Sequence, residues 1–100
     1  MDVAACFAAR RYATEDSLMV EVDGVRHRID GGLDGATCSR TRRRPDLVTD
    51  QSGAGALLLG GVTVSALVAG RRATVRDDHA RTRADAFMTL APVPHSTTGF

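Results

Sequence analysis

The sequence contains no tryptophan and no lysine, and it has few aromatic residues of any kind. Tyr12 is the only tyrosine, and the phenylalanines are Phe7, Phe87 and Phe100. Aromatic platforms on which nucleic-acid bases stack are therefore scarce. Because lysine is absent, all thirteen cationic side chains are arginines, and twelve acidic side chains leave a net charge of +1. This balance excludes a global field that would draw the chain onto nucleic acid or an anionic membrane.

Cysteines and long apolar segments are also few. Cys6 and Cys38 lack the paired spacing of a zinc site, and no signal peptide indicates an oxidising compartment. We therefore expect two reduced core cysteines. The longest apolar run, residues 55–70, is interrupted by Gly60 and Gly61 and is shorter than the roughly 20 apolar residues that span a bilayer. We expect a soluble, cytoplasmic protein, with neither a membrane nor nucleic acid among its partners.

The length and the 43% hydrophobic content suit one domain with an aliphatic core. In its first half, Val3, Cys6 and Phe7 have the spacing of a short amphipathic helix for which Asp2 is a possible N-cap. Residues 17–30 alternate between apolar and polar around Asp23-Gly24, which predicts a hairpin with a two-residue turn. His27 lies within this hairpin, and we expect its side chain to face solvent.

The remaining elements follow from caps, turns and periodicity. We predict a loop at 31–35, a strand at 36–40, a turn at 41–46 and a strand at 46–49. A helix through 53–61 follows, capped by Asp50 or Ser52 and ending at Gly60, and a second helix occupies 64–69 between Thr63 and Gly70. We then predict an edge strand within 71–76 and a helix within 77–90 with an apolar stripe of Ala80, Ala84, Phe87 and Met88. Strands come first and helices later, so the predicted class is α+β. We expect a mainly antiparallel sheet covered by helices on one face.

Candidate residues for chemistry are sparse. The arginine cluster Arg40–Arg44 is a candidate for phosphate contact, but its place in a turn also fits a solvated basic loop or a contact between domains. We expect His79 on a helix surface, and His95 lies in the tail. We find no paired ligands for a metal, no nucleophile elbow and no phosphate-binding glycine loop. The residues alone indicate a small α+β module that is not a self-sufficient enzyme and binds no cofactor or metal.

The order of five segments resembles the C-terminal domain of the enhanced intracellular survival (Eis) family of N-acetyltransferases. These segments are DVAACFAARRY (2–12), LMVEVDG (18–24), ATCSRTRRRPDLVTD (36–50), GALLLGGVTVSALVAGRR (55–72) and TRADAF (82–87). The resemblance implies a sterol-carrier-protein-like fold over residues 1–91. It also implies that two acetyltransferase-type domains of the GNAT superfamily precede this domain in the complete enzyme. That enzyme would be a homo-oligomer and would transfer an acetyl group from acetyl-CoA to amines, including aminoglycosides, polyamine-like compounds and lysine side chains.

In the family that the chain resembles, the C-terminal carboxylate is thought to enter the active site of the preceding domain as a general base. By position this role falls on Phe100, at the end of a tail over residues 92–100. A free α-carboxyl has a pKa near 3.3–3.7, and burial beside apolar groups raises such a value toward that of a useful base. The alternative is a free-standing lipid carrier, because the implied fold also holds apolar ligands and residues 56–68 are aliphatic enough to line a cavity.

Overall fold

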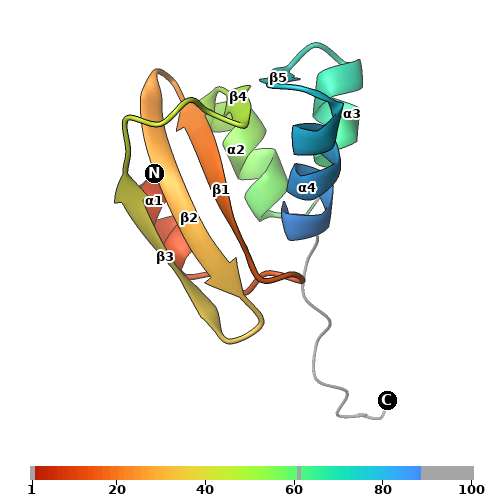
Figure 1. The fold of residues 1–100 in the computed structure, drawn as a ribbon. Coiled ribbons are helices and arrows are strands. Elements are labelled where there is room, and N and C mark those ends of the chain that lie inside the picture. Colours follow the sequence, from red (N-terminus) through yellow and green to blue (C-terminus); the bar gives the residue numbers. More distant parts are fainter. Residues whose placement is uncertain (1, 61, 89–100) are drawn as a thin grey trace, which may run out of the picture.

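The chain folds as an α+β domain, which the computed structural model describes over residues 2–60 and 62–88 (Figure 1). The elements in chain order are α1 (Val3–Ala8), β1 (Asp16–Val22), β2 (Val25–Gly32), β3 (Gly35–Arg40), β4 (Leu47–Thr49), α2 (Gln51–Leu58), α3 (Val64–Ala69), β5 (Ala73–Val75) and α4 (Asp78–Met88). Every predicted helix and strand within these residues is present, which confirms the predicted α+β class. The predicted loop at 31–35 is too long, because β2 continues to Gly32 and β3 begins at Gly35. The predicted tail, with His95 and Phe100, lies outside the described residues.

Local sequence signals account for where these elements begin and turn. The side chains of Asp2, Asp50 and Thr63 each accept a hydrogen bond from a backbone N–H in the first turn of the following helix, which is the role of an N-cap. Asp23 and Gly24 have φ values of 49° and 84°, as a tight two-residue hairpin turn requires. The predicted caps and the predicted hairpin turn are therefore confirmed.

The five strands form one mixed sheet in the order β3-β2-β1-β4-β5. The pairs β1–β2, β2–β3 and β4–β5 are antiparallel, whereas β1 and β4 are parallel, with Val20 opposite Leu47. The expectation of a mainly antiparallel sheet holds for three of the four pairings and fails for the pairing of β1 with β4. The parallel pair joins the N-terminal hairpins to the C-terminal half of the domain.

One face of the sheet carries the core. Leu18 and Ile29 lie opposite each other on β1 and β2, and Val20 faces the same way. These side chains belong to one cluster with residues of all four helices. The cluster comprises Phe7, Tyr12, Leu18, Val20, Val22, Ile29, Leu47, Ala54, Leu57, Val64, Leu67, Ala73, Ala84, Phe87 and Met88. Because every helix packs into this cluster, the prediction that helices cover one face of the sheet is confirmed.

The opposite face of the sheet is polar. Its outward positions on β1 and β2 pair across the strands, with Ser17 opposite Asp30 and Glu21 opposite Arg26. Arg26 forms an ion pair with Glu21 at 3.1 Å. The strands therefore alternate between a core side and a polar side, as expected for a sheet covered on one face.

Candidate functional site

The structure brings the C-terminal ends of α2 and α4 together on one side chain, Arg10. Its Nη1 donates to the carbonyl oxygen of Leu57 at 3.0 Å, and its Nη2 donates to the carbonyl oxygen of Met88. Carbonyls in the last turn of a helix lack intrahelical partners and carry partial negative charge. The Leu57 carbonyl also accepts from the Gly60 backbone N–H at 3.0 Å. The guanidinium placed between the two helix ends complements both helix dipoles. We call Arg10, Tyr12, Leu57, Phe87 and Met88 the helix-end junction.

Aromatic rings hold the helix-end junction from the core side. Tyr12 is fully buried, and its ring stacks on Phe87 with centroids 4.2 Å apart and planes 7° apart. The Tyr12 hydroxyl donates to the carbonyl oxygen of Phe7 at 2.8 Å. The Arg10 guanidinium carbon lies 5.4 Å from the centre of the Tyr12 ring, within the range of a cation–π contact. Residues at both ends of the domain are thereby fixed against each other.

Burial changes the proton affinity of both polar groups at the junction. It lowers the pKa of Arg10, an effect that the nearby Tyr12 partly offsets, and it raises the pKa of the Tyr12 hydroxyl. Tyr12 therefore stays neutral and Arg10 stays cationic at neutral pH. The Nε atom of Arg10 is buried without a hydrogen-bond partner among the described residues.

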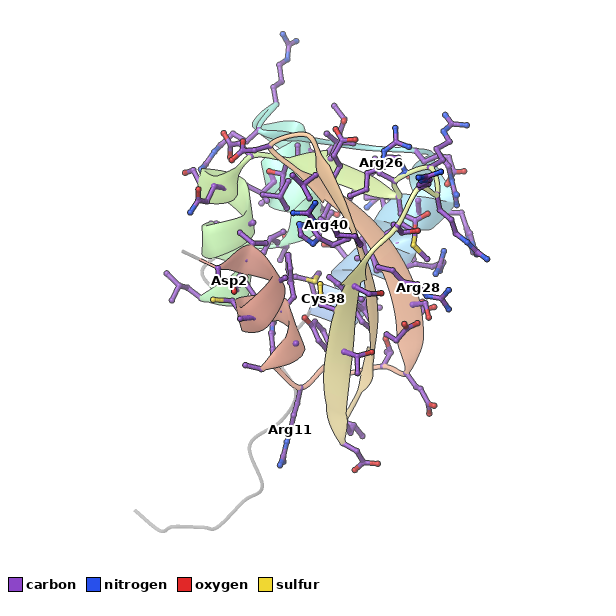
Figure 2. The ribbon with its side chains drawn as sticks, turned by 90° about the vertical axis from the view of Figure 1, so that its left-hand side faces the viewer. Asp2, Arg11, Arg26, Arg28, Cys38 and Arg40 are labelled. Carbon is purple, nitrogen blue, oxygen red and sulfur yellow. The ribbon has the colours of Figure 1, made fainter. Side chains whose placement is uncertain are left out.

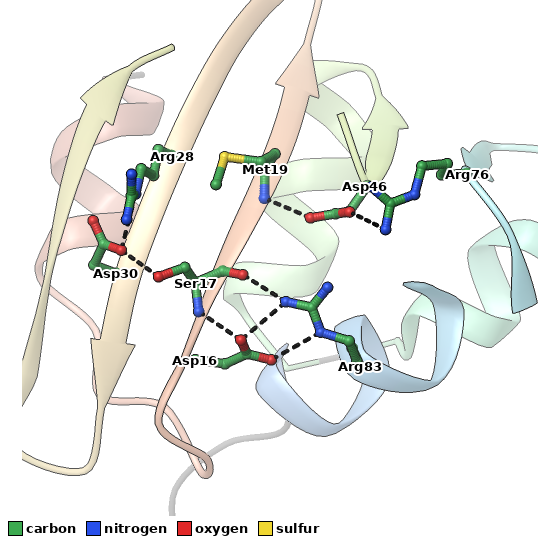
Figure 3. Close-up of polar contacts among 8 residues, drawn as sticks. All are labelled: Asp16, Ser17, Met19, Arg28, Asp30, Asp46, Arg76 and Arg83. Carbon is green, nitrogen blue, oxygen red and sulfur yellow. Dashed lines mark hydrogen bonds and ion pairs between the residues drawn. The ribbon is translucent and has the colours of Figure 1, made fainter. Parts of the chain in front are cut away.

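A second polar site lies on the open side of the sheet, in a groove of about 480 Å³. We call it the arginine groove. It is lined by Asp16, Ser17, Met19, Arg28, Arg43, Arg44, Asp46, Arg76 and Arg83. Figure 3 shows the polar contacts of the groove residues on β1, on α4, before β4 and after β5, together with the contact of Arg28 on β2 with the neighbouring Asp30. Five arginines against two aspartates give this groove a net positive charge.

Most of the charges in the arginine groove are paired. Arg83 donates to both carboxylate oxygens of Asp16 and to the carbonyl oxygen of Ser17 (Figure 3). The nearly buried Asp46 accepts from the Met19 backbone N–H at 3.0 Å and pairs with Arg76 at 3.1 Å. These contacts tie α4 and β5 to the start of β1, so their role in the fold is clear.

The hydrogen bonds in the groove also set the charge state of Asp16. Burial alone would raise the pKa of Asp16, but hydrogen bonds from Arg83 and from the Ser17 backbone outweigh it and lower the pKa. A hydrogen bond from Ser17 likewise lowers the pKa of Asp30, with help from Arg28 and against a smaller effect of burial. Both carboxylates are therefore ionised at neutral pH and serve as acceptors.

The predicted arginine cluster lies at one end of the open face. Arg40 ends β3, and Arg42, Arg43 and Arg44 follow in the turn before β4, as expected. The exposed side chains of Arg43 and Arg44 make no hydrogen bond or ion pair with other described residues. They are the arginines of the groove that are available to a partner.

His27 differs from the prediction. We expected a solvent-facing side chain, but His27 is 7% exposed and lies under α1, with its ring 6.5 Å from that of Phe7. The prediction was wrong because His27 shares the core side of β2 with Ile29, while Arg26 and Arg28 alternate to the polar side. Burial lowers the pKa of His27, and Arg40 lowers it further. His79 lies on the surface of α4, as expected.

The two cysteines are free and half-buried, so they are more exposed than the predicted core positions. Figure 2 shows Cys38 on β3 beside α1. Together with Asp2, His27 and Arg40, Cys38 lines a hollow of about 420 Å³. Among residues 2–60 and 62–88, no group of three or more His, Cys, Asp or Glu side chains could hold a metal ion. In the same residues, no helix has both the length and the apolar character needed to cross a membrane.

The fold and the helix-end junction define a small α+β domain, and comparison with known proteins shows where similar domains occur. No protein-family model matches the chain. An uncharacterized N-acetyltransferase of Streptomyces avermitilis is 34% identical over 107 aligned positions, which cover 100% of this chain and 26% of that protein. An uncharacterized N-acetyltransferase of Streptomyces coelicolor is 38% identical over 84 positions, covering 76% of this chain and 20% of that protein. The chain thus spans a fifth to a quarter of the length of these curated relatives, which are N-acetyltransferases.

Solved structures also match the chain to about a quarter of a longer protein. The crystal structure of Eis1 from Mycobacterium abscessus matches 99% of this chain and 26% of its own chain, with a TM-score of 0.76 and 28% identity. A GCN5-related N-acetyltransferase from Anabaena variabilis matches 88% of this chain and 24% of its own, with a TM-score of 0.79 and 16% identity. The second likeness shows a shared fold. The chain is therefore similar to one segment, about a quarter in length, of larger N-acetyltransferase chains.

Proposed function

We propose that this chain is the C-terminal domain of an Eis-type N-acetyltransferase of the GNAT superfamily. In this proposal, residues 1–91 form a sterol-carrier-protein-like domain, and residues 92–100 form a tail that reaches toward a preceding acetyltransferase domain. The observation that carries the proposal is the match to Eis1, which includes 99% of this chain but only 26% of that structure. A match with this coverage is expected when a short chain corresponds to one domain of a longer enzyme.

In this function the terminal carboxylate of Phe100 acts as the general base. It accepts a proton from the ammonium group of the acceptor, which leaves the amine nitrogen a lone pair for attack on the acetyl carbonyl of acetyl-CoA. The C–N bond forms as the C–S bond breaks, and the coenzyme leaves as a thiol once its sulfur gains the proton that the attacking nitrogen loses. The preceding domains would bind acetyl-CoA, and the complete enzyme would be a homo-oligomer. The acceptor class we propose is cationic amines of the aminoglycoside, polyamine and lysine types.

The charge of the arginine groove supports placing the amine site outside these residues. An ammonium group near Arg43 and Arg44 would meet a net positive field, because the nearby carboxylates of Asp16, Asp30 and Asp46 are already paired with Arg83, Arg28 and Arg76. Like charges at close range disfavour binding. The domain would therefore contribute its terminal carboxylate and a docking surface, and the acceptor would bind in the preceding domain.

The packing of residues 56–68 favours this function over a free-standing lipid carrier. Leu57, Val64 and Leu67 are each at most 2% exposed and pack into the shared core. Side chains that are packed against one another in a core are not available to line a ligand cavity. Displacement of a fluorescent fatty acid tests the alternative directly, and binding at micromolar lipid would support the carrier.

The test of the base is a one-residue extension of the complete enzyme. Adding one alanine after Phe100 moves the carboxylate by about 3.3–3.6 Å, which is beyond the reach of direct proton transfer. We expect kcat for amine acetylation to fall by about 10²-fold or more. Phe100→Leu is the matched control, because it changes the side chain and leaves the carboxylate at the same position. An extended enzyme that acetylates at the unchanged rate would show that the terminal carboxylate is not the base.

A further inference from the structure

The helix-end junction lies at Met88, four positions before the proposed catalytic tail of residues 92–100. Met88 is the last residue of α4, and the residues assigned to the tail follow it in sequence. The direction in which a chain leaves a helix is set by the last helical turn. Any contact that fixes the carbonyl of Met88 therefore fixes the starting point of the chain beyond it.

Arg10 makes that contact from a distant part of the sequence. Besides Met88, its guanidinium binds the carbonyl oxygen of Leu57 at the end of α2. Because the guanidinium is planar and rigid, its bond to Leu57 helps to fix the direction from which its other terminal nitrogen binds the Met88 carbonyl. Tyr12 and Phe87, whose rings stack on each other, support this arrangement from the core side.

The neighbouring arginine makes no such contact. Arg11 is exposed, and Figure 2 shows its side chain pointing away from the sheet and helices. No hydrogen bond or ion pair joins the Arg11 side chain to another described residue. The chain thus offers a matched pair of adjacent arginines, of which one holds two helix ends and the other holds none.

We infer that Arg10 is a positioning residue for the proposed acetyl transfer: it fixes the end of α4 and thereby places the terminal carboxylate in the active site. This inference rests on the proposed function. Arg10 does not touch the reacting atoms in this account and acts through the segment that begins at Met88. A carboxylate that must approach an ammonium group within hydrogen-bond distance is sensitive to a displacement of its anchor, because misplacement by about 1 Å can cost about 10²-fold in rate.

The inference predicts distinct behaviour for three variants of the complete enzyme. Arg10→Gln removes both the charge and the pair of terminal nitrogens that bind the two carbonyls. Arg10→Lys keeps the charge but cannot hold both carbonyls in the same geometry. We expect both to lower kcat per folded enzyme by about 10- to 100-fold, with the KM for acetyl-CoA unchanged. Hydrogen exchange measured by mass spectrometry should become faster in the peptide that begins with the last turn of α4. Arg11→Gln should leave kcat and exchange at wild-type values.

A double-variant cycle separates positioning from general destabilisation. If Arg10 acts through the tail, combining Arg10→Lys with the alanine extension should give the kcat of the extended enzyme alone, within about twofold. If the two effects multiply in full, Arg10 acts elsewhere and the inference is overturned. It is also overturned if Arg10→Lys matches Arg11→Gln in exchange and in kcat. If the extension alone leaves kcat unchanged, the proposed function fails, and the exchange comparison still decides whether Arg10 fixes the end of α4.

Discussion

Replacing Gly53 with alanine should destabilise the domain, although helix propensity alone predicts the opposite. Gly53 lies in the first turn of α2, where Gly→Ala normally stabilises a helix by up to about 1 kcal/mol. In this fold, a Cβ at position 53 would lie 2.0 Å from the hydroxyl oxygen of Thr49. Thr49 is nearly buried, and its hydroxyl donates to the carbonyl oxygen of Arg72 at 3.1 Å. Either α2 shifts from β4 or Thr49 rotates and gives up this hydrogen bond.

The two responses have similar magnitudes. Overpacking costs about 1–3 kcal/mol, and leaving the buried hydroxyl and carbonyl unpaired costs about 1–3 kcal/mol. After the helix-propensity gain is subtracted from either cost, we expect a net loss of about 0.5–2 kcal/mol in the free energy of unfolding. This corresponds to a fall in Tm of about 4–8 °C for each kcal/mol in a domain of this size. Urea and thermal denaturation followed by circular dichroism measure both quantities.

A second substitution tests the cause. Thr49→Ala removes the hydroxyl that the new methyl group meets and leaves the Thr49 Cβ position 3.3 Å away. The Gly53→Ala, Thr49→Ala double variant should therefore be more stable than the sum of the two single effects predicts. A rise in Tm for Gly53→Ala alone would refute this reasoning, because it would mean that the β4–α2 corner has room for a side chain.

Two further predictions concern the core. Tyr12→Phe keeps the ring that stacks on Phe87 but leaves the buried carbonyl of Phe7 without its donor. We therefore expect the free energy of unfolding, measured by urea denaturation, to fall by about 1–3 kcal/mol. An unchanged midpoint would show that this carbonyl finds another partner. Burial lowers the pKa of His27 in the folded chain below the ordinary histidine value of about 6.5. Between these two pKa values, the unfolded chain therefore binds more protons than the folded chain. The contribution of His27 to the free energy of unfolding should therefore be fully present above pH about 6.5. It should be lost as the pH decreases below that value, by up to about 1.4 kcal/mol per pH unit. His27→Gln should flatten this dependence, whereas a slope that survives the change would assign it to other groups; His79→Gln serves as the surface control.

Local signals in the sequence are enough to predict most elements of this fold. The caps Asp2, Asp50 and Thr63, and the Asp23-Gly24 turn, depend on contacts within a few residues, and each is where the sequence places it. Gly60, with φ of 74°, follows α2 in the left-handed conformation expected there. These features need no knowledge of the tertiary structure.

The missed features depend on residues far apart in the chain. The parallel pairing of β1 with β4 is not encoded in the alternation of either strand, because alternation specifies faces and not partners. His27 has the polarity of a surface residue, and only the position of α1 over β2 and β3 buries it. Arg10 and Arg11 are chemically identical neighbours, so no local pattern indicates that Arg10 binds the ends of α2 and α4.

The contact between Arg10 and Met88 joins residues 78 positions apart, and this separation has a consequence for synthesis of the protein. Arg10 leaves the ribosome long before the carbonyl that it binds has been made. The guanidinium can reach both of its acceptors only when α4 is complete and packed against the sheet. A nascent or truncated chain that lacks the end of α4 keeps Arg10 without one of its two acceptors. The bond is therefore a late event in biogenesis, and its formation marks a chain in which α4 is complete.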